Sequence, residues 1–298
     1  MNAESGSNDK ADARAAISRA VEESGRKLEI VVARRPRDLP GLARRAAERG
    51  PCILAAAGGD GTLNAVAEVA REKNLPLGII PLGTFNYFAR DLGIPEDPAG
   101  AARVLTEGQP RRVAAGFANG RIFLNNASFG LYRRLIEERE THKRRFGRRR
   151  LVALFSALAT LLQRHRVYHL HLEVNGEPVA FSTLSVFFGR NALQLEQLGL
   201  DEALCVARGE LAVLAPREVG RLRMLGLMLQ GALGQLETAA DLRQGCARRV
   251  EIKRLGGGGQ RIKVAIDGEV AECRLPLVVE SIPEALWMMV PTAPERER

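Results

Sequence analysis

The chain has 298 residues, 46% of them hydrophobic and 27% charged, which is enough for two globular domains with cores of their own. Its 44 Lys and Arg against 35 Asp and Glu leave a formal charge of +9, which favours polyanionic partners such as nucleotides, nucleic acid or an anionic membrane face. The four cysteines have no metal-ligand spacing, which argues against a zinc site and a disulfide framework and indicates buried thiols: Cys52, Cys205, Cys246 and Cys273.

The first third of the chain alternates between helical and strand patterns. Apolar residues recur at helical spacing in some segments, and short continuous apolar runs follow glycine or proline breaks in others. The predicted helices are 10–23, 39–49, 63–73 and 85–92, and the predicted strands are 28–33, 52–57 and 77–80. This alternation predicts an α/β domain with a doubly wound parallel sheet, whose ligand sites lie at the carboxyl ends of the strands.

Beyond about residue 112 the pattern changes to segments rich in valine and phenylalanine, separated by turns. Predicted strands are 121–124, 168–174, 181–188, 210–214 and 262–266, and predicted helices are 132–138, 151–163 and 219–236. Asn175-Gly176 between two such strands is a strong hairpin signal. We expect residues 1–115 to form the α/β domain, with residues 276–298 packing back on it, and residues 116–275 to form a β-rich, antiparallel sandwich-like domain.

A glycine-rich segment follows the second predicted strand. Gly58-Gly59-Asp60-Gly61-Thr62 stands between this apolar strand and a helix, so its N–H groups and the helix dipole face whatever occupies the turn. We expect the three glycines to allow close backbone approach and positive φ angles. The segment predicts a phosphate site, at which Asp60 acts through Mg²⁺ because a carboxylate repels phosphate directly. A plain strand-turn-helix connection is the structural alternative.

A second polar segment, Pro81 to Pro95, follows the next strand and therefore emerges at the same edge of the sheet. Thr84 and Asn86 can hydrogen-bond a nucleotide. Arg90, one helical turn beyond Asn86, can reach phosphate oxygens or a carboxylate. The alternative makes Asn86 a helix cap and Arg90 a solvated surface residue.

A third candidate segment is Asp267-Gly268-Glu269, at the end of the predicted strand 262–266. One carboxylate could accept the proton of a substrate hydroxyl while the other orients a metal or Arg90. We favour Glu269 as the base, with Asp267 as the second candidate. A tight turn, in which Asp-Gly is common, is the structural alternative.

The segments GGDGTLN at 58–64, PLGTFNYFARDLGIP at 81–95 and Asp267-Gly268-Glu269 together resemble the diacylglycerol kinase catalytic-domain family, which includes bacterial lipid kinases and sphingosine and ceramide kinases. The resemblance covers essentially the whole chain in order and spacing. It implies a nucleotide domain, a β-rich lipid domain and an active site in the cleft between them.

The resemblance also implies roles for single residues. It assigns the base to the Asp267-Gly268-Glu269 segment, magnesium-nucleotide binding to Asp60, and ATP contact to the glycine turn and Thr84. With Arg90, which is inferred from its reach to phosphate, the predicted catalytic residues are Glu269, Asp267, Asp60 and Arg90. Asn2 to Gly6 resembles the family's first nucleotide loop; the strand that precedes this loop in the family is missing, which suggests a misassigned start codon. The predicted ATP-binding residues are Asn2, Ser5, Gly6, Gly58, Gly59, Asp60, Gly61, Thr62, Asn64, Thr84 and Asn86.

Three positions depart from the family's acidic pattern. Tyr87 stands where many members have aspartate after asparagine, and Ala114 lies where they carry an acidic residue after the domain crossover. Arg208-Gly209 replaces an Asp-Gly turn of a structural magnesium site, and arginine cannot ligate Mg²⁺. We therefore expect that structural metal site to be missing and the carboxylate network to be thinner.

A basic run, 143–150, precedes the longest apolar run, 151–162, which is shorter than the roughly 20 residues of a membrane-spanning helix. The two suit the surface of an anionic bilayer, and a solvated loop before a core helix is the alternative. The polar N-terminus lacks the apolar segment of a signal peptide, so we expect a cytoplasmic protein that associates peripherally with membranes. No nucleic-acid partner is expected, because no aromatic platform is present.

The sequence thus predicts an ATP- and Mg²⁺-dependent kinase of a lipid hydroxyl, with diacylglycerol favoured over a sphingoid base. A soluble-substrate kinase of the NAD kinase or phosphofructokinase kind is the first alternative. A non-catalytic lipid- or nucleotide-binding protein is the second, motivated by the altered acidic positions. The sequence does not determine which lipid is used, and a homodimer is compatible with it.

Overall fold

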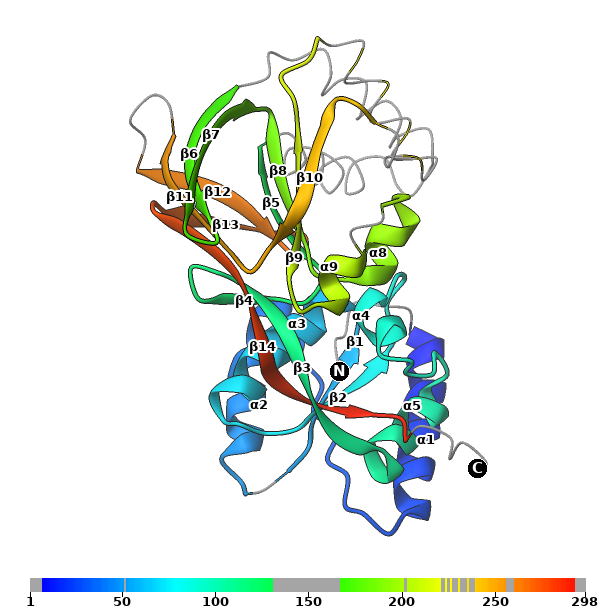
Figure 1. Cartoon of the computed structure of the whole chain (residues 1–298). Helices are drawn as coiled ribbons and strands as arrows, with labels where there is room; N and C mark the ends of the chain where they lie inside the picture. The colour runs from blue at the N-terminus through cyan, green and yellow to red at the C-terminus, as the bar shows by residue number, and fades with distance from the viewer. Residues whose placement is uncertain are drawn as a thin grey trace. The chain divides into compact units, whose positions relative to one another are not determined.

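The computed structural model describes residues 7–50, 52–130, 167–200, 203–220, 239–255 and 260–292, together with Arg223, Gly226, Gln230 and Gln235 (Figure 1). The chain divides into two compact units. Residues 1–115 and 283–298 form unit 1, and residues 116–282 form unit 2. The strands β3 (Gln109–Ala118) and β14 (Leu277–Val290) run across the boundaries between the two.

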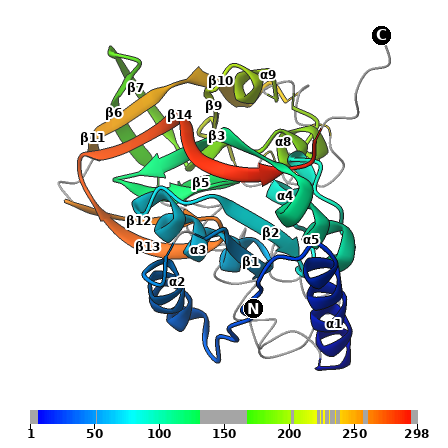
Figure 2. The same ribbon diagram turned by 90° about the horizontal axis from the view of Figure 1, so that it is seen from below.

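Unit 1 is built on parallel strands. β1 pairs in parallel with β2 from Leu54↔Leu77 to Gly58↔Pro81, and β14 joins the other side of β2 in parallel at Met288↔Leu77. Helix α1 packs beside α5, and α2 beside α3 (Figure 2). The elements are α1 (Ser7–Glu23), a 3₁₀ turn (Pro36–Asp38), α2 (Leu39–Ala47), β1 (Leu54–Gly58), α3 (Asp60–Glu72), β2 (Leu77–Pro81), α4 (Tyr87–Asp91) and α5 (Pro98–Glu107).

One predicted strand and the predicted start of one helix in unit 1 were wrong. Residues 28–32, predicted as a strand, lie in no strand, and Ala33 forms only an isolated bridge. Helix α3 begins at Asp60 rather than at residue 63, because the N–H groups of Thr62 and Leu63 already donate to the carbonyl of Gly59 at 2.9 and 3.1 Å. The glycine-rich segment is therefore mostly the first turn of the helix.

Unit 2 is a two-layered antiparallel structure. One layer is a six-stranded sheet in the order β10-β9-β8-β5-β12-β13; in the other, β6 pairs with β7 and β11, and β11 pairs with β14. Buried side chains from both layers, among them Phe129, Phe188 and Ile252, form one core. The strands are β4 (Arg121–Phe123), β5 (Asn126–Gly130), β6 (Tyr168–Val174), β7 (Glu177–Thr183), β8 (Ser185–Gly189), β9 (Leu211–Pro216), β10 (Leu242–Ala247), β11 (Arg249–Leu255), β12 (Arg261–Ile266) and β13 (Glu269–Arg274).

Two short helices, α8 (Ala192–Gln197) and α9 (Ala203–Ala207), lie in a second buried cluster with Phe187 and Leu214 on the six-stranded sheet. The predicted hairpin is confirmed: Asn175 and Gly176 have φ of 52° and 94° and connect β6 to β7. The predicted class, mixed α/β with two sheets, is confirmed as well.

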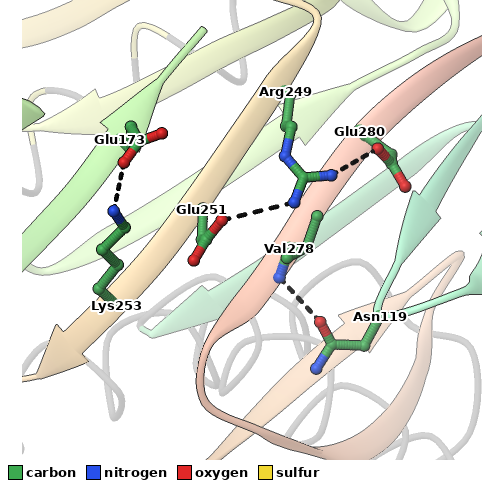
Figure 3. Close-up of polar contacts among 7 residues, drawn as sticks. All are labelled: Asn119, Glu173, Arg249, Glu251, Lys253, Val278 and Glu280. Atoms are coloured by element: carbon green, nitrogen blue, oxygen red, sulfur yellow. Dashed lines mark hydrogen bonds and ion pairs between the residues drawn. The ribbon is translucent and has the colours of Figure 1, made fainter. Parts of the chain in front are cut away.

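Ion pairs join neighbouring strands on the exposed face of unit 2 (Figure 3). Arg249 on β11 contacts Glu280 on β14 at 2.9 Å and Glu251 at 3.4 Å. Lys253 on β11 pairs with Glu173 on β6, and this carboxylate raises the pKa of the lysine. Because these pairs are exposed, they add little stability each and mainly favour this strand register over others.

The cysteine prediction was wrong for one pair. Cys205 on α9 and Cys246 on β10 are joined by a disulfide that closes a loop of 41 residues. Sequence spacing cannot reveal such a pair, because the tertiary fold alone brings α9 against β10. Cys52 and Cys273 are free thiols, and burial raises the pKa of both. Among the described residues no helix is long and apolar enough to cross a membrane.

Candidate functional site

Two loops of unit 1 lie side by side at the carboxyl ends of β1 and β2. The register that pairs Gly58 with Pro81 continues beyond the strands, where the Leu82 N–H donates to the Gly58 carbonyl at 3.0 Å. Residues 58–62 and 82–86 are thereby brought together as predicted from the parallel sheet. Both loops open at the edge where ligand sites of such sheets lie.

Glycine is required in these loops by close packing. A Cβ on Gly83 would stand 2.5 Å from the Cα of Gly59, and a Cβ on Gly58 would stand 2.5 Å from the hydroxyl oxygen of Thr62. None of the three glycines at 58, 59 and 61 has a positive φ, so that part of the expectation was wrong. The glycines let two backbones touch and leave no side chain over the start of α3.

The side chain of Asn86 fixes the conformation of the second loop through two hydrogen bonds to Gly83. Its Oδ1 accepts from the Gly83 N–H and its Nδ2 donates to the Gly83 carbonyl, both at 3.0 Å. The residue is 8% exposed and has a φ of 48°, a conformation that asparagine tolerates better than most residues. Asn86 precedes α4 but makes no side-chain cap, so its visible role is to hold the loop rather than to cap the helix.

The start of α3 has the features of an anion site. The first N–H groups of a helix have no intrahelical partner and carry the positive end of its dipole. The Oδ1 of Asn64, one turn into α3, is buried without a hydrogen-bond partner among the described residues, and as an acceptor it suits a donor group of a ligand rather than an anion. Thr62 is 6% exposed, its hydroxyl lies against Gly58 and its N–H donates to the Gly59 carbonyl, so Thr62 contributes to the turn rather than to a ligand contact.

Asp60, the first residue of α3, is half-buried and is the acidic residue of the first turn. No group of three or more metal-ligating side chains occurs among the residues that the structure describes. A single carboxylate is nevertheless compatible with Mg²⁺, which keeps several waters and takes further oxygens from nucleotide phosphates. The residues present therefore fit a magnesium-nucleotide better than a metal ion alone.

Thr84 lies in the loop after β2, Arg90 lies in α4 just beyond it, and both residues are exposed. The Nε of Arg90 lies 3.6 Å from a carboxylate oxygen of Glu96, and the arginine side chain remains 41% exposed. Of the two partners predicted for Arg90, phosphate and carboxylate, the structure contains the carboxylate. An exposed pair of this kind is weak, so it leaves the arginine able to exchange partners.

Asp267, in unit 2, lies in a turn, and its carboxylate accepts hydrogen bonds from the backbone. Asp267 and Gly268 have φ of 44° and 88° and connect β12 to β13, as the turn alternative predicted. The carboxylate accepts from the N–H groups of Leu124, Asn125 and Asn126 at 2.7, 2.9 and 2.9 Å. A carboxylate held by three backbone donors is a poor proton acceptor, because protonation would sacrifice those bonds.

Glu269, two residues on, is exposed at the start of β13 and pairs across the turn with Ile266. Successive side chains alternate along a strand, but the intervening turn reorients the chain between Asp267 and Glu269. The structure thus separates the two carboxylates by environment: Asp267 binds backbone, and Glu269 faces solvent. The choice of Glu269 over Asp267 as the base stays a prediction.

Two buried amides near Asp267 escaped the sequence analysis. The Asn126 N–H donates to the Asp267 carboxylate, its carbonyl accepts from the Asp267 N–H, and its side-chain Nδ2 donates to Gln194 at 2.9 Å. Asn191 caps α8 through its Oδ1, at 2.9 Å from the N–H of Gln194. The Oδ1 of Asn126 and the Nδ2 of Asn191 have no partner among the described residues. The pair Asn125-Asn126 directly after a predicted strand could have indicated polar site residues from the sequence, whereas no sequence feature marked Asn191.

Other predicted residues cannot be compared. Asn2, Ser5 and Gly6, the basic run 143–150 and the apolar run 151–162 lie outside the described residues. Of the departing positions, Tyr87 stacks on Phe85 at the start of α4, and Ala114 lies within β3. Arg208 contacts Glu210 at 3.7 Å and the Cys246 sulfur at 3.0 Å, so this turn is held by side chains.

Residues 1–118 match the family model described as the diacylglycerol kinase catalytic domain. A protein of Chromohalobacter salexigens named "Probable lipid kinase YegS-like" is 42% identical over 123 residues, 40% of this chain and 39% of that protein. A protein of Staphylococcus aureus named "Diacylglycerol kinase" is 48% identical over 90 residues, 30% of this chain and 29% of that protein. The matched part thus spans about two fifths of the length of the first of these relatives.

Solved structures extend the likeness to the whole fold. A crystal structure of a diacylglycerol kinase from Bacillus anthracis str. Sterne superposes with a TM-score of 0.67 at 18% identity, covering 97% of this chain and 94% of that one. A second structure from the same organism gives a TM-score of 0.71 at 20% identity, with coverage of 97% and 95%. The chain therefore shares the two-domain fold of these proteins in both of its units.

Proposed function

We propose that this chain, whose first 118 residues match the diacylglycerol kinase catalytic-domain model, is an ATP-dependent lipid kinase. It would transfer the terminal phosphoryl group of ATP to the hydroxyl of a membrane lipid. Diacylglycerol is the favoured substrate and phosphatidic acid the product. The names of the relatives support a lipid substrate in general, and the choice of diacylglycerol among lipids is our own.

One observation carries the proposal: the contact between the glycine-rich start of α3 and the loop after β2. The 2.5 Å that a Cβ on Gly83 would leave to Gly59 shows how tightly the loops fit, and the glycines at 58, 59 and 61 have no side chains that could cover the helix terminus. Exposed N–H groups at that terminus suit phosphate oxygens. Phosphoryl transfer depends mainly on positioning and charge neutralisation, which is what such a site supplies.

Individual roles follow from these environments. The backbone N–H groups ahead of Thr62 at the start of α3 would bind phosphate, Asp60 would hold Mg²⁺ and Thr84 would contact the nucleotide. Mg²⁺-ATP, when bound, supplies the phosphoryl group and neutralises its charge. Arg90 would leave its ion pair with Glu96 and bind a phosphate oxygen instead. Glu269 would accept the proton of the lipid hydroxyl, and Asp267 would position the Leu124–Asn126 segment.

The lipid hydroxyl would be recognised by the amides beside Asp267. Asn126 Oδ1 and Asn191 Nδ2 offer one buried acceptor and one buried donor, the pair of functions that a hydroxyl needs. A buried polar atom without a partner costs free energy, so a ligand that satisfies it gains affinity. Contact with an anionic membrane, driven by the positive net charge, would deliver the lipid.

The test is transfer of labelled phosphate from ATP to a panel of diacylglycerol, sphingoid base, ceramide, NAD and sugar phosphate. We expect label in diacylglycerol, and a loss of about 10²-fold or more in kcat for Glu269→Gln at unchanged Tm. Asp60→Asn should abolish transfer. Label in NAD or a sugar phosphate alone would favour a soluble-substrate kinase, and binding of ATP without transfer to any acceptor would favour a non-catalytic protein.

A further inference from the structure

The ring of Phe85 is exposed beside the candidate nucleotide site. Of the phenylalanines that the structure describes, Phe85 is the most exposed, at 45%, whereas Phe88, three residues on, is 4% exposed. Single apolar residues on a protein surface are common, so exposure alone does not indicate a site. The position of Phe85 does, because it stands between Thr84 and Asn86 in the loop that connects β2 to α4 (Figure 1).

The backbone on both sides of Phe85 is fixed. On one side, a Cβ on Gly83 would stand 2.5 Å from the Gly59 Cα, so the two backbones touch. On the other side, Asn86 is 8% exposed, and its two hydrogen bonds to Gly83 close the loop around residues 84 and 85. Phe85 is two residues from Gly83, which limits the distance between their Cα atoms to about 7 Å. A rigid loop close to the start of α3 therefore carries the ring.

The ring of Phe85 also has a fixed orientation. It stacks on the ring of Tyr87 with a centroid separation of 5.5 Å and an interplanar angle of 1°. Parallel rings at this separation are within the range of offset-stacked aromatic pairs. Tyr87 is the first residue of α4 and is partly buried, so Phe85 rests on a side chain that the fold holds in place. The two rings form a short stack in which Phe85 is the more exposed member.

An aromatic ring in this place suits the base of a nucleotide. Every base has a π face, and stacking on an aromatic side chain contributes about 5- to 100-fold in affinity. The ribose separates the phosphates of a nucleotide from its base, so a platform for the base has to lie beside the phosphate site rather than within it. Phe85 meets this condition, because it lies in the loop that touches the glycine-rich turn and is not part of that turn.

We propose that Phe85, supported by Tyr87, is the residue on which the nucleotide base stacks and that it gives the site a preference for purine nucleotides. The inference rests on the proposed function, because it takes the same site to bind ATP. All the residues concerned belong to unit 1, so the arrangement does not depend on unit 2. Tyr87, which departs from the family's acidic pattern, thereby has a role of its own: its ring positions the ring of Phe85.

Nucleotide binding by the full chain tests the proposal, measured by calorimetry with the magnesium complexes of ATP, UTP and inorganic tripolyphosphate. Phe85→Ala should weaken ATP binding at least about 10-fold and remove most of the preference for ATP over UTP. Its affinity for tripolyphosphate, which has phosphates but no base, should be unchanged. Val32→Ala is the matched control, since Val32 is also 45% exposed in unit 1, and it should bind all three ligands like wild type.

Phe85→Trp adds a spectroscopic readout. A base that stacks on the introduced indole should change its fluorescence when ATP is added but not when tripolyphosphate is added. The wild-type protein corrects for the signal of Trp287, the one tryptophan of the sequence. Phe85→Leu, which keeps apolar bulk without a π face, should bind ATP more weakly than Phe85→Trp.

Equal ATP affinity of wild type and Phe85→Ala would overturn the proposal. An equal loss of ATP and tripolyphosphate binding would also overturn it, because the substitution would then act on the loop. Loss of binding to vesicles of phosphatidylcholine and phosphatidylserine, at unchanged ATP affinity, would assign the ring to the membrane surface instead. If wild type binds neither ATP nor tripolyphosphate, the proposed function fails and this inference with it. A protein that binds ATP through Phe85 but transfers no phosphate would count only against the proposed function.

Discussion

Gly83 shows how a single residue determines the geometry of the candidate nucleotide site. Gly83→Ala places a methyl group 2.5 Å from the Gly59 Cα and 2.7 Å from Asn86 Oδ1, so the two loops must separate. We expect a loss of about 1–3 kcal/mol in stability and at least a 10-fold rise in the KM for ATP. Gly41→Ala, which meets nothing within 4 Å on helix α2, is the control and should leave the KM for ATP unchanged without any loss of stability, since alanine favours a helix. Equal behaviour of both variants would contradict this account.

Asn86 permits a separation of backbone and side-chain effects. Asn86→Gly keeps the positive φ accessible but loses both bonds to Gly83, whereas Asn86→Ala loses both features. We expect both variants to weaken ATP binding, with alanine the less stable by about 1 kcal/mol, measured by denaturant unfolding. Wild-type ATP binding in the glycine variant would mean that the side chain is dispensable.

Asp267 is expected to act on structure and Glu269 on chemistry. Asp267→Asn puts an amide NH₂ against backbone N–H groups and should cost about 1–3 kcal/mol of stability. Asparagine accepts the positive φ of this position, so the loss comes from the hydrogen bonds. Thermal unfolding of the two single variants is the measurement. A stable, inactive Asp267→Asn would instead make Asp267 the base.

At the scale of elements, α2 and α3 are joined by a bidentate pair. Arg44 Nε and Nη2 each lie 3.2 Å from a carboxylate oxygen of Glu72. The hydrogen bond from Arg44 holds the pKa of Glu72 below its usual value of about 4.3. Because the folded pKa is lowered, the pair stabilises the fold above the unfolded pKa, and this contribution is lost as pH falls through the folded pKa.

The expected outcome is a small difference in Tm between wild type and Glu72→Gln at pH 7 that disappears by about pH 3. Because the pair is exposed, the difference should also shrink with added salt. Glu177→Gln is the control, since Glu177 is exposed and no ion pair is seen for it in the part of the chain that the structure describes. A difference that grows as pH falls would have the wrong sign.

At the scale of the molecule, the formal charge of +9 is expected to govern binding to charged membrane surfaces. Sedimentation with vesicles should show binding to membranes rich in anionic lipid and little binding to neutral ones. Raising the salt from about 0.1 to 1 M shortens the Debye length from about 10 to 3 Å and should release the protein. Binding to neutral vesicles that is insensitive to salt would indicate apolar insertion instead.

The succession of α1, α2, β1, α3, β2 and α4 in unit 1, the hairpin at Asn175-Gly176 and the meeting of the two polar loops were predictable from the sequence. They depend on local periodicity, turn chemistry and the rule that parallel strands end at one edge, which need no knowledge of the rest of the chain. The roles proposed for Asp60, Thr84, Arg90 and Glu269 stay predictions.

Only the tertiary structure decided the rest, because it depends on contacts between residues far apart in sequence. It joined Cys205 to Cys246, directed three backbone N–H groups to Asp267 and buried Asn126 and Asn191. It also placed residues 28–32 in no strand despite their strand composition. A strand forms only where an edge accepts it, and the sequence of one segment carries no information about its neighbour.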